Sequence, residues 1–117
     1  HYAPKGDLTI VEGDREKVAA AIRKYVTGDM TAGLKSAVIT CSEDAGLYIL
    51  SGDTELINIG SIYHEEQIAA NLYRVLRRMD DDNIDRIYSE SFSGSGLGMA
   101  VMNRLLKAAG HKIVRIN

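Results

Sequence analysis

Short apolar runs rich in β-branched residues alternate along the chain with longer segments that have helical spacing. The apolar runs are typical of buried strands, which we expect at 7–12, 36–41, 55–60, 84–89 and 112–116. The segment 43–50 fits a strand or a short helix equally well. A polar lead, residues 1–6, contains the one proline, Pro4, and is predicted to be a linker.

Three segments between these runs repeat apolar residues every three or four positions, as one face of a helix does. The first follows Asp14, whose side chain is suited to cap a helix, and Gly28 is expected to end it. The second spans about 64–79 and the third 99–109, before Gly110. Their predicted inward residues are Val18, Ile22, Tyr25 and Val26, then Ile68, Leu72, Val75, Leu76 and Met79, then Met102, Leu105, Leu106 and Ala109.

Strands that alternate with helices of ten residues or more favour parallel β-α-β units with right-handed crossovers. We therefore predict an α/β fold, a three-layer α/β/α sandwich with a mainly parallel sheet of about five strands. Residues 7–117 would form this one domain, since 117 residues are about one domain long.

Composition excludes several classes of protein. The chain is 45% hydrophobic and 26% charged, within the globular range, and its net charge of -2 offers no basic surface for nucleic acid. A single cysteine, Cys41, rules out an intrachain disulfide framework and a multi-cysteine metal site. No apolar run approaches the roughly 20 residues of a membrane span. The chain begins at His1 without a secretory signal, so we expect a cytoplasmic piece of a longer protein.

A glycine-rich turn is the strongest candidate for a binding site. Gly94, Ser95, Gly96 and Gly98 lie between a predicted strand and a predicted helix, where free backbone N–H groups can hold a phosphate. The turn lacks the third glycine of the dinucleotide fingerprint and the acidic residue that would hold a ribose. The competing interpretation is that the glycines only permit a tight turn.

Two other features bear on chemistry. Cys41 ends a predicted strand, where ligands bind in α/β sheets, yet no partner base is identifiable, so we expect a small buried apolar side chain. The triplet Asp80, Asp81 and Asp82 follows a helix and is expected to be a solvated turn. The sequence thus predicts no catalytic set and no metal site.

Two segments carry a family resemblance: His1-Tyr2-Ala3-Pro4 at the start and the run GLGMAVMNRLLKAAG at 96–110. They resemble the linker and the C-terminal domain of the long form of threonylcarbamoyl-AMP synthase. The resemblance implies a Rossmann-like accessory domain. It also implies that the catalytic domain, which uses ATP with Mg²⁺, threonine and bicarbonate to make the intermediate for threonylcarbamoyladenosine in transfer RNA, lies upstream.

The same resemblance implies a role for the linker. In the family, the His-Tyr-x-Pro motif lies over the entrance of the synthase active site, which assigns that position to His1, Tyr2 and Pro4. The chain by itself is then expected to be inactive and to hold no cofactor, with the synthase domain as its partner. The alternative is a domain that binds a small ligand or a nucleotide phosphate through the Gly94–Gly98 turn.

Overall fold

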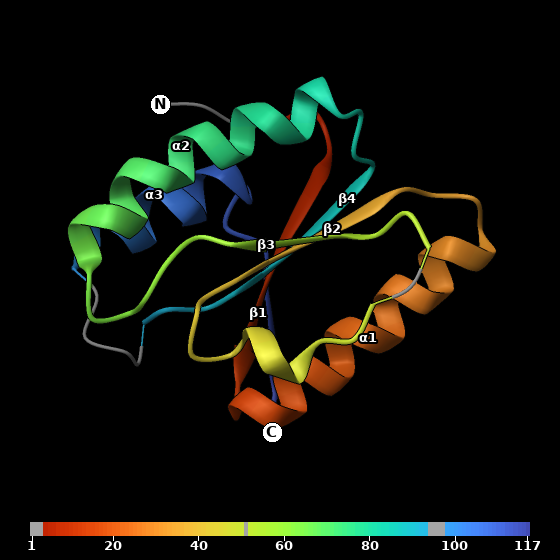
Figure 1. Ribbon diagram of the computed structural model, residues 1–117, viewed down its shortest axis with the longest axis horizontal. Helices are drawn as coiled ribbons and strands as arrows, with labels where there is room; N and C mark the ends of the chain where they lie inside the picture. The colour runs from red at the N-terminus through yellow and green to blue at the C-terminus, as the bar shows by residue number, and fades with distance from the viewer. Residues whose placement is uncertain (1–3, 51, 94–97) are drawn as a thin grey trace.

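A computed structural model describes residues 4–50, 52–93 and 98–117. In these parts of the chain, five strands alternate with three α-helices and one short 3-10 helix (Figure 1). The strands are β1 (Asp7–Gly13), β2 (Ser36–Thr40), β3 (Glu55–Asn58), β4 (Arg86–Glu90) and β5 (Ile113–Ile116). The helices are α1 (Arg15–Thr31), η1 (Ala45–Leu47), α2 (Glu65–Asp81) and α3 (Met99–Ala108).

All five strands are parallel and form one sheet in the order β3-β2-β4-β1-β5. The order places β4 between β1 and β2, with Thr9 paired to Tyr88 and Val38 paired to the same Tyr88. Strands β1, β2 and β4 are flanked on both sides, which agrees with the nearly continuous burial of β2 and β4 and with the burial of Leu8, Ile10 and Val11 in β1. The predicted α/β class with a parallel five-strand sheet is confirmed.

The helices cover both faces of the sheet, α1 on one face and α2 with α3 on the other (Figure 1). The larger core, under α2 and α3, includes Ile10, Ile39, Leu72 and Leu105. The smaller core, under α1, includes Val11, Ile22 and Val38. Adjacent residues of one strand, such as Ile10 and Val11, thus enter different cores, which makes the predicted three-layer sandwich.

Helix α1 is longer than predicted, because Gly28 does not end it. The helix continues to Thr31 and the chain turns away at Gly33, which has φ +78°. The N–H groups of Gly33 and Leu34 donate to the carbonyl groups of Met30 and Asp29, at 3.0 and 2.8 Å. Glycine inside a helix costs only about 1 kcal/mol, so the C-terminal bonds decide where the helix ends.

The structure also settles the form of the segment 43–50 and differs from the prediction in the buried face of α3. The ambiguous segment 43–50 contains η1, and no strand, within the part of the chain that the structure describes. In α3 the buried side chains are Val101, Leu105 and Ala108, whereas the predicted Met102 and Leu106 are only partly buried.

No helix in the described residues combines the length and apolarity needed to cross a membrane.

Candidate functional site

A cavity of about 810 Å³ opens at the carboxyl ends of β1, β2 and β4. The chain leaves β1 toward α1 and leaves β4 toward α3, and these helices lie on opposite faces of the sheet. Adjacent parallel strands whose connections diverge in this way create the crevice in which α/β sheets bind ligands. The topology thus predicts a binding site at the carboxyl ends of these strands, whatever side chains line it.

Glu90, the last residue of β4, is a carboxyl group buried at the base of the cavity, with 5% of its surface exposed. Its Oε2 atom accepts hydrogen bonds from the Thr40 hydroxyl at 2.8 Å and from the Tyr48 hydroxyl at 2.7 Å. Ile39 pairs with Ser89 in the sheet, so the next residues of the two strands, Thr40 and Glu90, are neighbours. Burial raises the pKa of the Glu90 carboxyl to about 7, and the bond from Tyr48 opposes part of that rise.

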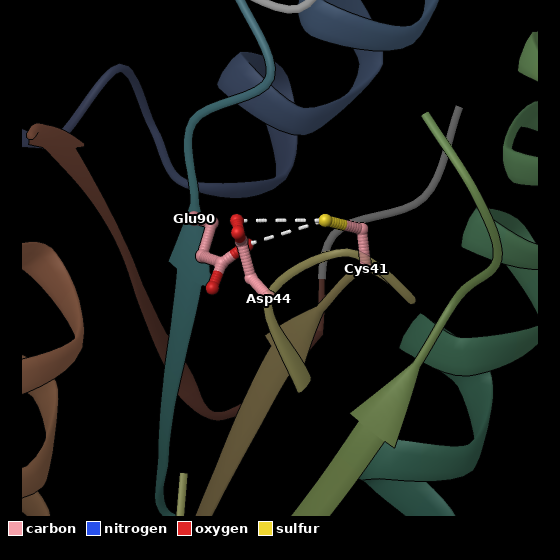
Figure 2. Close-up of side chains that lie close together, drawn as sticks. All are labelled: Cys41, Asp44 and Glu90. Carbon is pink, nitrogen blue, oxygen red and sulfur yellow. Dashed lines mark hydrogen bonds between the residues drawn. The ribbon is translucent and has the colours of Figure 1, made fainter. Parts of the chain in front are cut away.

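Cys41 and Asp44 complete a cluster with Glu90 (Figure 2). The Cys41 sulfur lies 3.8 Å from Glu90 Oε1 and 3.5 Å from Asp44 Oδ2. Burial, with the charge of Glu90 second, raises the pKa of the Cys41 thiol to about 12. A thiol in this setting stays protonated at neutral pH and is a poor nucleophile. The predicted burial of Cys41 is confirmed, since 1% of it is exposed.

Arg15 and Glu43 hold the connection between β2 and β3 in place beside the cavity. Arg15 donates from Nε to Asp44 Oδ1 at 2.6 Å and from its terminal nitrogen to the Glu43 carbonyl at 2.8 Å. The Glu43 carboxylate in turn accepts from the Ser61 hydroxyl at 2.7 Å and from the Ile62 N–H at 2.9 Å. These bonds to the charged form lower the pKa of Glu43, with Ser61 the largest cause. Glu43 and Asp44 are therefore fixed both to Arg15 of α1 and to the segment that follows β3.

Most of the predicted site residues lie outside the part of the chain that the structure describes. His1 and Tyr2 lie outside the described residues, as do Gly94, Ser95 and Gly96. Pro4 is half-buried, and the next residue, Lys5, donates its N–H to Asp80 at 2.7 Å. Asp7 pairs with Arg86, the first residue of β4. This segment therefore lies at the amino ends of the strands, and the cavity lies at their carboxyl ends.

Gly98 immediately precedes α3, and its surroundings bear on the predicted phosphate site. A Cβ at this position would overlap a carboxylate oxygen of Glu65, so glycine permits the close approach of that side chain. A phosphate at the same point would meet a like charge, which disfavours it by simple electrostatics. Phosphate binding by the Gly94–Gly98 turn stays a prediction.

The sequence interpretation missed the cluster around Glu90. Its members are far apart in the chain, 49 residues in the case of Cys41 and Glu90. One feature of the sequence could have indicated the cluster: two buried runs each end in polar residues, Thr40-Cys41 and Ser89-Glu90. That signal becomes a site only when β2 and β4 are known to be adjacent, which the strand order shows and the sequence does not.

Comparison with known proteins agrees with the fold and the motifs. Residues 1–110 match the family described as threonylcarbamoyl-AMP synthase, C-terminal domain. The threonylcarbamoyl-AMP synthase of Bacillus subtilis is 41% identical over 115 residues, which cover 98% of this chain and 31% of the relative. The chain thus spans about a third of the length of the curated relatives it matches.

Two solved structures share the architecture. Pyrococcus abyssi Sua5 in complex with L-threonine superposes with a TM-score of 0.81 at 36% identity, covering all of this chain and 32% of that one. The separately solved C-terminal Sua5 domain from Pyrococcus horikoshii gives a TM-score of 0.73 at 36% identity, covering 97% of this chain and 100% of that one. The family match covers nearly the whole chain, which therefore belongs to the C-terminal domain family of threonylcarbamoyl-AMP synthases.

Proposed function

We propose that this chain is the accessory domain of a synthase that makes L-threonylcarbamoyladenylate from ATP, threonine and bicarbonate for the modification of transfer RNA. The observation that carries the proposal is coverage: the chain aligns over 98% of its length with 31% of a full synthase. The reaction then belongs to the other two thirds of the protein. A structure of a relative in complex with L-threonine supports threonine as a substrate of the whole enzyme.

The chemistry of the described side chains supports an accessory role. The buried thiol of Cys41 faces the carboxyl groups of Glu90 and Asp44, which do not lower its pKa to the range of a nucleophile. The basic side chain at the cavity, Arg15, is engaged with Asp44 and the Glu43 carbonyl. Such a set does not provide the combined site for ATP and an amino acid that the synthase reaction needs.

The linker is the proposed route by which the domain acts. Its first described residue, Pro4, lies beside Lys5, which is fastened to Asp80 at the end of α2. The domain thereby holds the base of the linker, while His1 and Tyr2 extend toward the synthase domain and cover its active site. Covering an active site positions substrates and excludes water.

The remaining assignments follow from this role. ATP with Mg²⁺ binds in the synthase domain, and this domain holds no cofactor of the synthase reaction. The partner is the protein's own synthase domain, with no direct contact to nucleic acid or membrane, and the compartment is the cytoplasm. The second candidate function, ligand binding at the Gly94–Gly98 turn, is favoured by one observation: Ser93, just before the turn, lines the cavity.

Pyrophosphate release tests the proposal. The whole synthase, the present chain alone and a synthase that ends before Asp7 are compared with ATP, threonine and bicarbonate. We expect turnover from the whole protein, none above the no-enzyme blank from the chain alone, and a clear loss in the truncated protein. Turnover by the chain alone, or full activity without it, would contradict an accessory role.

A further inference from the structure

We propose that Cys41, Asp44 and Glu90 form a binding site for one zinc-type divalent cation at the carboxyl ends of β2 and β4. The donors are the Cys41 sulfur, Asp44 Oδ2 and Glu90 Oε1, which converge at the base of the cavity (Figure 2). All three atoms lie within 4.8 Å of one another. The inference is independent of the synthase role and concerns this domain alone.

The spacing fits a tetrahedral centre. Zinc binds thiolate at about 2.3 Å and carboxylate at about 2.1 Å, so a sulfur and an oxygen on one tetrahedral zinc are about 3.6 Å apart. The Cys41 sulfur lies 3.5 Å from Asp44 Oδ2 and 3.8 Å from Glu90 Oε1. Both sulfur–oxygen separations thus match a tetrahedral zinc, and the two carboxylate oxygens lie within 4.8 Å of each other.

Each carboxylate is also oriented for this purpose. On Glu90, Oε2 accepts from Thr40 and Tyr48, which leaves Oε1 directed at the sulfur. On Asp44, Oδ1 accepts from Arg15, which leaves Oδ2 directed at the sulfur. Metal ligands are commonly held in this manner by a shell of outer hydrogen bonds.

The buried carboxyl group of Glu90 has no cationic partner among the described residues. Glu90 has only 5% of its surface exposed, and it takes part in none of the ion pairs among the described residues. The groups that face Glu90 are Asp44, Cys41 and Tyr48, and none of them carries a positive charge. The nearby guanidinium group of Arg15 is paired with Asp44. Buried carboxylates in proteins are usually paired or bound to a metal.

The donor set selects the ion. Sulfur with two oxygens suits zinc, whereas calcium takes six to eight oxygens and magnesium keeps a near-octahedral oxygen shell. On binding, the Cys41 thiol releases its proton to solvent and the sulfur forms the bond to the metal. Three protein ligands would leave the fourth position of a tetrahedral zinc for water or an oxygen of a small ligand, and the cavity beside them is also lined by Val11, Val18 and Phe92.

Cobalt titration tests the site. The chain is treated with a chelator, dialysed, and titrated with Co²⁺, which reports a bound thiolate through a sulfur-to-cobalt charge-transfer band in the near ultraviolet. We expect one equivalent to give the band and Zn²⁺ to displace it. C41S should abolish the band, and E90Q should weaken Co²⁺ binding at least about tenfold, the lower end of losses on removing groups that support a metal.

Controls separate this cluster from other acidic groups. D81N alters an exposed carboxylate at the last residue of α2 and should leave the titration unchanged; Asp80 and Asp81 belong to this helix, and the predicted solvated turn after it begins only at Asp82. Circular dichroism spectra of the metal-free variants establish that each is folded. Absence of saturable binding by both Co²⁺ and Zn²⁺, retention of the band in C41S, or loss of binding in D81N with retention in E90Q would each overturn the proposal.

Discussion

The Tyr88 hydroxyl on β4 donates a hydrogen bond of 2.5 Å to the Asp29 carboxylate on α1. Asp29 is buried and also accepts from the Ser36 hydroxyl at 2.9 Å, so an acidic side chain in the helix is joined to two strands. Burial, with the bond to Asp29 second, raises the pKa of Tyr88. None of these three residues lines the cavity, and we assign them a structural role.

Removal of the Tyr88 hydroxyl should destabilise the domain. Y88F leaves the buried Asp29 carboxylate with one donor fewer, which costs about 1–3 kcal/mol of unfolding free energy. Urea denaturation followed by circular dichroism measures the loss. The matched control is Y63F, since Tyr63 is 78% exposed and should change stability by less than about 0.5 kcal/mol. Equal stability of the two variants would show that the buried hydrogen bond is not stabilising.

Stability of the metal-free domain should depend on Glu90 in a defined pH window. The pKa of Glu90 is about 7 in the folded protein and about 4.3 when unfolded, so between these values the folded state binds the extra proton. The contribution of Glu90 is therefore present below about pH 4.3 and is lost as pH rises through about 7, by up to about 4 kcal/mol.

The measurement is a series of denaturation curves from about pH 4.5 to about pH 8 in the presence of a chelator, a range that spans the titration of Glu90. E90Q keeps the size of the side chain and removes its titration, so it should lack this part of the pH dependence. Subtraction of the E90Q curve from the unaltered curve isolates the residue from other carboxyl groups. A difference that grows more favourable to the unaltered protein as pH rises would give the shift the wrong sign.

The reach of sequence-based prediction differs from one residue of this protein to another. Periodicity predicted the helix over Ile68 and Leu72 because a strongly amphipathic stripe has one stable place, against the sheet. It could not show that Gly28 is internal to α1, because the end is set by bonds from Gly33 and Leu34. The Cys41–Glu90 contact was likewise beyond reach, since it depends on the strand order.

Two glycines should respond very differently to alanine. Gly13 ends β1 with φ +150°, and a Cβ there would overlap the backbone carbonyl oxygen of Ile116. G13A should cost on the order of 2–4 kcal/mol, from backbone strain and displacement of β5. A Cβ at Gly46 would have nothing within 4 Å, so G46A is the control and should be nearly neutral. Thermal denaturation of the two variants measures the difference. Similar melting temperatures for G13A and G46A would contradict the close approach of β5 to Gly13.

The linker residues should matter to the synthase and not to this domain. H1A/Y2A removes the side chains that we propose cover the active site of the synthase domain. In the present chain, the double variant should change the free energy of unfolding by less than about 0.5 kcal/mol, as most surface changes do. In the whole synthase the same changes should lower turnover or raise the apparent KM for ATP or threonine, because an incomplete cover positions substrates poorly and admits water.

A variant at the fastened end of the linker separates covering from tethering. D80A removes the acceptor of the Lys5 N–H, a bond of 2.7 Å, and leaves His1 and Tyr2 in the chain. If the domain acts by holding the base of the linker, D80A should lower turnover of the whole synthase less than H1A/Y2A does, since the covering side chains are still present. The proposed covering role would be wrong if H1A/Y2A lowered the melting temperature of the present chain clearly and left the turnover of the whole synthase unchanged. The linker would then have a structural role.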